Sequence, residues 1–178
     1  MSPIKLLDKY YKDNPKLYQV LLDHSRSVTR KALTIAAKHP ELKLDCRFLA
    51  EASMLHDIGV FLTDAPGIYC YGKEPYIRHG ILGAELLREE GYPRHARVCE
   101  RHTGAGISLE DIRRGNLPLP YRSFLPETME EKVICFADKF FSKSKLTKEK
   151  TVDQARRSIV ARSALGAERF DKWCKLFL

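Results

Sequence analysis

No stretch of this chain is long and apolar enough to cross a membrane, because charged side chains make up 30% of its 178 residues and interrupt the hydrophobic runs. The segment from Met1 to Asp8 has neither the charge order nor the apolar centre of a secretory signal peptide. Internal repeats, low-complexity stretches and nucleic-acid-binding motifs are missing as well. The length and the hydrophobic fraction of 44% suit one globular domain. We therefore expect a cytoplasmic protein with no membrane partner.

Closely spaced cysteines are missing too. The five cysteines are odd in number, and no two are neighbours in the sequence: Cys46, Cys70, Cys99, Cys135 and Cys174. A zinc ribbon needs closely spaced pairs, and a secreted disulfide scaffold normally has an even number. Neither is expected here, and free thiols fit a reducing cytoplasm.

The net charge of +8 is concentrated at one end of the chain. From Lys139 to Leu178 there are eleven Lys and Arg against four Asp and Glu, which gives +7 (11 − 4). Two interpretations stay open: a solvated helical face, or a surface that attracts a phosphorylated substrate or a nucleic acid.

Apolar residues recur at helical spacing along most of the chain, which predicts an all-α bundle. We expect a single domain over residues 1–178, with residues 139–178 as a basic C-terminal helical extension packed on it. Helices are predicted over Leu17–Lys38, Cys46–His56, Ile77–Glu90, Pro93–His102, Glu127–Phe141 and, as one or two helices, Thr151–Leu178. Glycine, proline and an irregular pattern predict a loop from Thr63 to Pro75, and three prolines predict a non-helical crossing from Gly115 to Pro126.

A few side chains carry more specific expectations. Ser108 with Asp111 is typical of a helix start with a capping box. Gly83 would allow a neighbouring helix to approach closely, and Trp173 and Phe177 are expected to pack inward.

Polar side chains on apolar helix faces point to a site. His24 lies within the apolar stripe of its helix, and Asp138 lies between Ile134 and Phe141 on another. Burying such groups is costly unless they have a partner. An ordinary hydrogen bond or ion pair could satisfy each one singly, and a divalent metal ion could satisfy several together.

The dipeptide His56-Asp57 precedes Gly59, where a helix is expected to end. Adjacent residues within a helix point about 100° apart, but at its last turn both side chains can converge on one cavity. His79 and His102 add further imidazoles on inner faces. His95 could compete with His102 as a ligand.

These residues resemble the signature of the HD-domain metal-dependent phosphohydrolases of the HDIG type, a histidine, a His-Asp pair and a distant aspartate on a helical bundle. Here these are His24, His56-Asp57 and Asp138. The segment from Arg101 to Asp138 is similar to a small single-domain subgroup of largely unassigned function. Val60 stands where two other subgroups carry an extra glutamate or lysine, so neither of those roles is transferred.

The resemblance implies one or two divalent ions, namely Mn, Fe, Ni, Co, Zn or Mg, which suit histidine and carboxylate ligands. The expected ligands are His24, His56, Asp57, His79, His102 and Asp138. Asp57 is the expected catalytic residue, bridging two ions and orienting the nucleophilic hydroxide. Arg78, Arg122 and Lys139 are the candidate cations for binding the substrate phosphate.

The leading functional hypothesis is a phosphohydrolase acting on a small phosphomonoester or phosphodiester, with a nucleotide as the first choice. An alternative on the same fold is a dinuclear-iron oxygenase. A third is a non-catalytic nucleic-acid-binding module that uses its basic end for contact and binds in a salt-sensitive manner. A homodimer is also left open.

Overall fold

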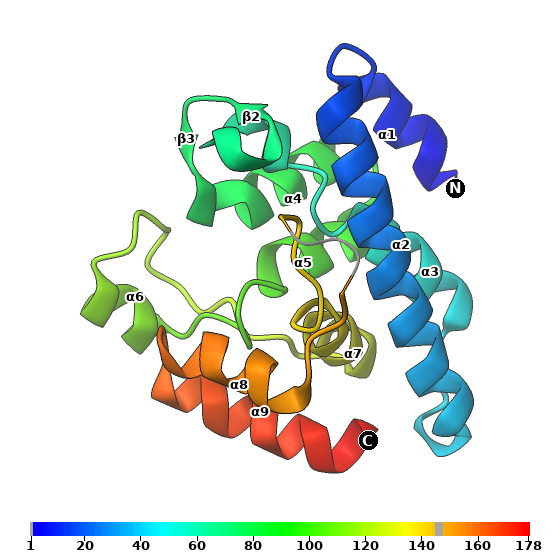
Figure 1. Cartoon of the computed structure of the whole chain (residues 1–178), viewed down its shortest axis with the longest axis vertical. Helices are drawn as coiled ribbons and strands as arrows, with labels where there is room; N and C mark the ends of the chain where they lie inside the picture. The colour runs from blue at the N-terminus through cyan, green and yellow to red at the C-terminus, as the bar shows by residue number, and fades with distance from the viewer. Residues whose placement is uncertain (1, 145–147) are drawn as a thin grey trace.

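The computed structural model describes residues 2–144 and 148–178, and most of them lie in helices (Figure 1). The helices are α1 (Pro3–Tyr11), α2 (Pro15–Lys38), α3 (Cys46–Leu55), α4 (His79–Glu89), α5 (Pro93–Arg101), α6 (Leu109–Gly115), α7 (Met129–Asp138), α8 (Val152–Val160) and α9 (Ala164–Phe177). The predicted helical bundle is confirmed. Helix α1 was not among the predicted helices, and α8 and α9 are two separate helices.

The helices begin where short polar side chains cap their first turn. The Asn14 and Asp45 side chains accept hydrogen bonds from backbone N–H groups at the starts of α2 and α3. The predicted capping box of Ser108 and Asp111 opens α6. Thr128 and Thr151 open α7 and α8 in the same way. Each cap satisfies donors that the helix itself leaves free.

The loop prediction for residues 63–75 was wrong in part, because this segment forms a small sheet. Strand β1 (Thr63–Ala65) lies between β2 (Cys70–Tyr71), which is antiparallel to it, and β3 (Glu74–Pro75), which is parallel. Strands of two or three residues are too short to show an alternating pattern. Their pairing is therefore visible only in the folded chain.

Two hydrophobic cores meet along α2. The first half of α2 belongs to the same hydrophobic cluster as residues of α1, α4 and α5, whereas its second half belongs to a cluster with residues of α3, α7, α8 and α9. Leu21 belongs to one core and Val28 to the other. His24 lies between these two residues on the same face and is buried. The site described below therefore lies at the junction of the cores.

The C-terminal helices belong to the core. Helices α8 and α9 lie against each other along one edge of the molecule (Figure 1), and α9 contacts α7. The Phe136 ring on α7 lies 5.1 Å from the Phe170 ring and 5.3 Å from the Phe177 ring on α9, measured between centroids. Trp173 and Phe177 are buried, as predicted.

Within the described residues, no helix has the length and hydropathy needed to span a membrane. All five cysteines are free thiols.

Candidate metal centre

The predicted ligands are brought together by helix ends. His56 caps the end of α3 and Asp57 follows it, His79 is the first residue of α4, His102 caps the end of α5, and Asp138 is the last residue of α7. Only His24 comes from the middle of a helix, α2. All of these side chains are buried. A side chain at a helix end is less restricted by neighbouring turns than one in the middle. The ends of four helices can therefore bring their side chains together in one small volume.

The junction between α3 and α4 depends on two glycines. A Cβ atom on Gly59 would lie 2.3 Å from the backbone nitrogen of Gly83 and 2.4 Å from the carbonyl oxygen of His79. A Cβ atom on Gly83 would lie 3.0 Å from the backbone nitrogen of Gly59. The close approach predicted for Gly83 is therefore present, and it places His79 beside the His56-Asp57 pair.

The two carboxylate oxygens of Asp57 face different pairs of histidines. Oδ2 lies 3.2 Å from Nε2 of His24 and 3.0 Å from Nε2 of His56. Oδ1 lies 3.4 Å from Nε2 of His79 and 3.3 Å from Nε2 of His102. One carboxylate thus stands between two groups of nitrogen atoms.

These groups have the composition of two neighbouring cation sites. The first consists of His24, His56, Asp57 and Asp138, and the second of Asp57, His79 and His102; in each, the candidate ligand atoms lie within 4.8 Å of one another. Asp138 completes the first group, with Oδ1 3.0 Å from Nε2 of His24. Four imidazoles and two carboxylates form a donor set that divalent transition metals accept.

Backbone hydrogen bonds orient three of the imidazoles in the same way. The Nδ1–H groups of His56, His79 and His102 donate to the carbonyl oxygens three residues earlier, at 2.6, 2.6 and 2.7 Å. A carbonyl can only accept, so the proton of each neutral ring is on Nδ1 and the lone pair is on Nε2. Metal-bound histidines in proteins are usually held by such a bond.

The Nε2 atoms of the four histidines lie close to one another and to the Asp57 carboxylate. Nε2 of His79 lies 3.0 Å from Nε2 of His102, and Nε2 of His24 lies 3.3 Å from Nε2 of His56. Neither oxygen of the buried Asp57 carboxylate makes a hydrogen bond of good geometry. Lone pairs that converge on ionised oxygens in this way need a positive charge between them. The residues present therefore fit a metal ion.

The charge states of the centre support the same conclusion. Burial raises the pKa of Asp57, but the positive charges of His56 and Lys143 outweigh it and hold that pKa well below its usual range. Burial lowers the pKa of His79 to about 3, so its ring is neutral. Burial also lowers the pKa of His56, but the Asp57 and Asp138 carboxylates raise it to about 9 overall. The negative charge of the two carboxylates, which holds a proton on His56, would also attract a cation.

Two lysines supply positive charge at the centre. Nζ of Lys139 lies 2.7 Å from Oδ2 of Asp138, and Nζ of Lys143 lies 2.6 Å from Oδ2 of Asp57. Lys139 was among the predicted substrate cations, whereas Lys143 was missed. The only sign of Lys143 in the sequence is the basic surplus after residue 139, which does not distinguish it from solvent-exposed lysines.

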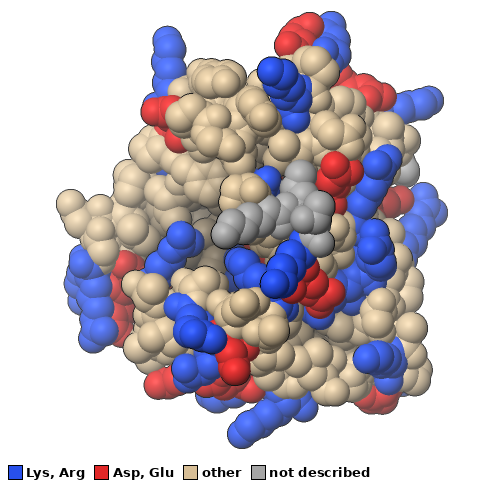
Figure 2. Space-filling view, viewed as in Figure 1, with Lys and Arg blue, Asp and Glu red and all other residues tan. Residues whose placement is uncertain are grey.

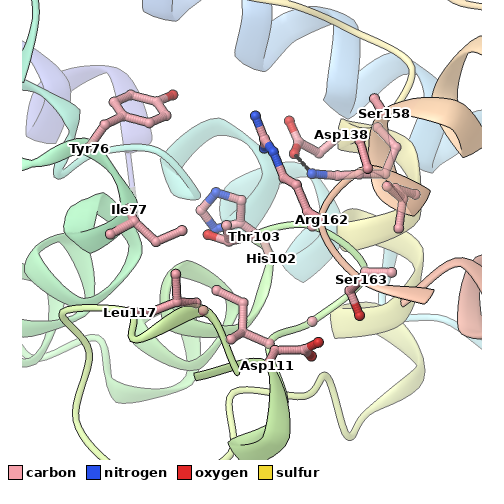
Figure 3. A pocket seen from close by; sticks show the side chains of 18 of the residues that line it. Tyr76, Ile77, His102, Thr103, Asp111, Leu117, Asp138, Ser158, Arg162 and Ser163 are labelled. Atoms are coloured by element: carbon pink, nitrogen blue, oxygen red, sulfur yellow. Dashed lines mark ion pairs between the residues drawn. The ribbon is translucent and has the colours of Figure 1, made fainter. Parts of the chain in front are cut away.

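The centre forms one side of a cavity of about 1080 Å³. His79, His102 and Asp138 line this cavity, and Figure 3 shows the His102 and Asp138 side chains among its lining residues. Its other walls come from α6, α8 and the segment 103–107. This volume is slightly above the usual range for small-molecule sites, about 300–1,000 Å³.

The structure places the remaining predicted residues away from the cavity. Arg78 forms an ion pair with Glu74, with Nη1 2.9 Å from Oε2, and Arg122 forms one with Glu100, with Nη2 3.0 Å from Oε2. Neither arginine is among the residues that line the cavity. Their predicted contact with substrate gains no support from these positions.

His95 is not part of the centre. Its ring makes edge contacts with Phe48 and Tyr92, and its Nε2 lies 3.4 Å from a carboxylate oxygen of Glu51. The side chain belongs to the packing between α3 and α5, so the structure gives it no access to the ligand position that was left open for it.

A helical bundle with a buried cluster of histidines and aspartates at its helix ends is typical of a metal-binding helical protein. The sequence model of the HD domain family matches residues 21–142, and the chain belongs to this family. The predicted resemblance is confirmed.

Three relatives show in what context similar sequences occur. Two are named tRNA (cytidine(56)-2′-O)-methyltransferase: that of Thermoplasma volcanium is 35% identical over 153 residues, and that of Picrophilus torridus is 34% identical over 128 residues. The aligned part is 85% and 71% of this chain but only 40% and 33% of those proteins. An uncharacterized protein of Methanocaldococcus jannaschii is 36% identical over 121 residues, 66% of this chain and 64% of that protein.

The chain thus spans less than two thirds of the length of each of these relatives. No solved structure matches it significantly.

Proposed function

We propose that the chain is a metal-dependent phosphohydrolase that cleaves a small phosphoester, with a nucleotide as the preferred substrate class. The observation that carries this proposal is the division of the Asp57 carboxylate, one oxygen toward His24 and His56 and the other toward His79 and His102. Such a carboxylate is suited to be shared by two cations.

Each residue then has a definite role. His24, His56, Asp57 and Asp138 would hold one divalent ion, and Asp57, His79 and His102 a second. Two such ions supply a water of lowered pKa and positive charge against the phosphoryl oxygens. Asp57 is the catalytic residue, because its carboxylate is placed to orient the attacking water. The ammonium groups of Lys139 and Lys143 would turn to the phosphate once the carboxylates have other partners.

The family membership supports hydrolysis, since HD domains suggest metal-dependent hydrolases. Membership does not identify the ion. The donor set suits Mn, Fe, Ni, Co, Zn or Mg, because it contains imidazole and carboxylate groups but no thiolate.

A second candidate function is a role on or beside RNA. It is favoured by the names of two relatives, in which a segment similar to this chain is part of a tRNA methyltransferase. The surplus of basic residues after Lys139 would suit contact with a phosphate backbone. This candidate predicts binding of tRNA that weakens steeply with salt and survives the loss of the metal ligands.

The test combines metal content with a screen of phosphate esters. Anaerobically purified protein should bind at least one and up to two divalent ions per chain, and it should hydrolyse a nucleotide with Mn or Co. The variant Asp57→Asn should lose bound metal and more than about 100-fold of the activity, because loss of even an outer partner of a metal ligand costs about 10–100-fold.

His39→Gln is the matched control, because His39 pairs with Glu41 outside the centre. Less than one ion per chain under all conditions would contradict the proposal. Turnover that requires oxygen would favour the dinuclear-iron oxygenase instead.

A further inference from the structure

The cavity holds more positive charge than the metal centre uses. Lys150 and Arg162 also line it. Within residues 2–144 and 148–178, neither side chain forms an ion pair, although the other lining cations Lys139, Lys143 and Arg114 each do. Cations on a cavity wall without a carboxylate partner are available to bind an anion.

These two cations lie close to the centre. Burial lowers the pKa of Lys150, as do the positive charges of Lys139, Arg162 and Lys143, whereas the Asp138 carboxylate raises it. Lys150 is therefore within electrostatic reach of both Asp138 and Arg162. Figure 3 shows the Arg162 side chain extending into the cavity from the end of α8, on the same side as Asp138.

The packing of α8 determines the position of the Arg162 backbone. Ala155 and Ile159 on α8 are buried in the core, and the backbone N–H of Arg162 donates to the carbonyl of Ile159 at 2.9 Å. Arg162 as a residue is exposed, but the backbone hydrogen bond holds its main chain beside the cavity. Figure 2 shows Lys and Arg side chains around the hollow on this face of the molecule.

The wall between the metal centre and the α6 side of the cavity is apolar. Ile77, Ile107 and Leu117 line it, and the Tyr76 ring stacks on the His79 ring with centroids 4.7 Å apart. A bare phosphate would use neither this wall nor the volume beside it. A nucleoside attached to the phosphate would use both, because its base and sugar bury apolar surface.

We propose that Lys150 and Arg162 form a second anion-binding subsite, which holds a second phosphate group of the substrate while the first lies at the metal centre. The substrate class is then a nucleoside with phosphates at two separate positions, either a free nucleoside bisphosphate or the terminal nucleotide of an oligonucleotide. This inference rests on the proposed function. Both residues lie outside the segment 21–142 that matches the HD domain family, so the subsite is a feature of this chain beyond the family match.

The subsite can be tested by binding without metal, which separates it from catalysis. Adenosine 3′,5′-bisphosphate is titrated calorimetrically in EDTA into the wild type and the double variant Lys150→Gln/Arg162→Gln. Because the double variant removes both charges that would pair with the second phosphate, it should bind at least about 10-fold more weakly.

The matched control is Arg157→Gln/Lys172→Gln, which removes the same charge from exposed positions on α8 and α9 that do not line the cavity. The control should bind within about twofold of the wild type, since general charge contributes little at physiological salt. Equal weakening in the two double variants, or no weakening in either, would overturn the subsite. Thermal unfolding of every variant verifies that it is folded.

A second measurement uses the metal-loaded protein. With Mn²⁺, the KM for adenosine 3′,5′-bisphosphate should rise about 10-fold in Lys150→Gln/Arg162→Gln with little change in kcat, while the KM for AMP stays the same. An equal rise in KM for AMP would overturn the assignment of these residues to the second phosphate. A short 5′-phosphorylated oligoadenylate that binds more tightly than the bisphosphate would identify a nucleic-acid end as the source.

The two proposals can fail separately. If no phosphoester is hydrolysed but the bisphosphate binds in EDTA with the expected difference between variants, the hydrolase proposal fails and the anion subsite stands. If hydrolysis is found but the variants bind alike, the subsite fails alone.

Discussion

Single side chains at helix ends set the geometry of the candidate metal centre. An imidazole that follows the last turn of a helix can donate from Nδ1 to a carbonyl three residues earlier, as His56 and His102 do. That bond satisfies an acceptor the helix leaves free and leaves Nε2 pointing outward. One residue thus ends the helix and presents a candidate ligand atom.

Lys143 gives a prediction about which positive charge compensates the Asp57 carboxylate. Its ammonium group lies 2.6 Å from Asp57. In EDTA, Lys143→Gln should lower the free energy of unfolding by about 1–3 kcal/mol, because Asp57 loses a buried ionic partner. With Mn²⁺ the loss should become smaller, because the ion supplies that charge. Urea unfolding in both conditions measures the difference, with the exposed Lys172→Gln as control; an equal loss in both conditions would contradict the prediction.

Among the elements, α6 begins with a capping box that contains the Asp111 carboxylate, and the contribution of this carboxylate to stability depends on pH. Burial raises the pKa of Asp111, but hydrogen bonds from Ser108 and Ser163 outweigh it, so the pKa lies below its usual value of 3.8. A lowered pKa means that the folded state favours the ionised form. Its stabilisation is therefore present above pH 3.8 and is lost as the pH falls through the folded-state value.

The corresponding variant is Asp111→Asn. At pH 7 it should be less stable than the wild type by about 0.5–2 kcal/mol, the usual contribution of such a cap. The difference should shrink toward pH 3 and below, because the wild-type carboxyl group is then increasingly protonated. Urea unfolding over this pH range tests it, and Glu110→Gln on the same helix turn is the control. A difference that does not change with pH would show that only the shape of the side chain matters.

The contact between α4 and the end of α3 gives a third prediction. In Gly59→Ala the new methyl group would lie 2.3 Å from the backbone of Gly83, so α4 must move or the fold must lose stability. We expect a loss of about 3 kcal/mol or more, together with weaker metal binding because His79 is displaced. Gly67→Ala is the control, since nothing lies within 4 Å of its added Cβ atom. Unchanged metal affinity in Gly59→Ala would contradict the prediction, because it would mean that the position of His79 does not depend on this helix contact.

For the molecule as a whole, the C-terminal helices are part of the hydrophobic core. Phe170 on α9 is fully buried and contacts Phe136 and Phe140 on the other side of the interface. Phe170→Ala should therefore lower the free energy of unfolding by about 3–5 kcal/mol. Leu176→Ala, on the same helix but 39% exposed, should cost less than about 1 kcal/mol. Denaturant unfolding compares them, and similar losses would mean that α9 is only loosely attached.

Much of the fold and of the centre could be predicted from local patterns. The periodicity of apolar residues identified α2–α5 and α7 and predicted one or two helices where α8 and α9 lie, and it placed His24 and Asp138 on inner faces. Glycine after His56-Asp57 indicated a helix end, and Ser108 with Asp111 indicated a cap. These features depend on residues within a few positions of one another, so they can be inferred without knowing the tertiary structure.

Which basic side chains form ion pairs and which line the cavity depended on packing between distant segments. Arg78 and Arg122 were predicted to bind substrate, but nearby carboxylates pair with them, whereas Lys143, Lys150 and Arg162 reach the cavity. In a chain with many basic side chains, neighbours in sequence do not determine which cation faces a cavity. That depends on how α8 packs on α9 and α9 on α7, and on which carboxylates that packing brings within a few ångströms. Helix formation is local, but charge pairing across a fold is not, because it requires the distances that only the assembled core sets.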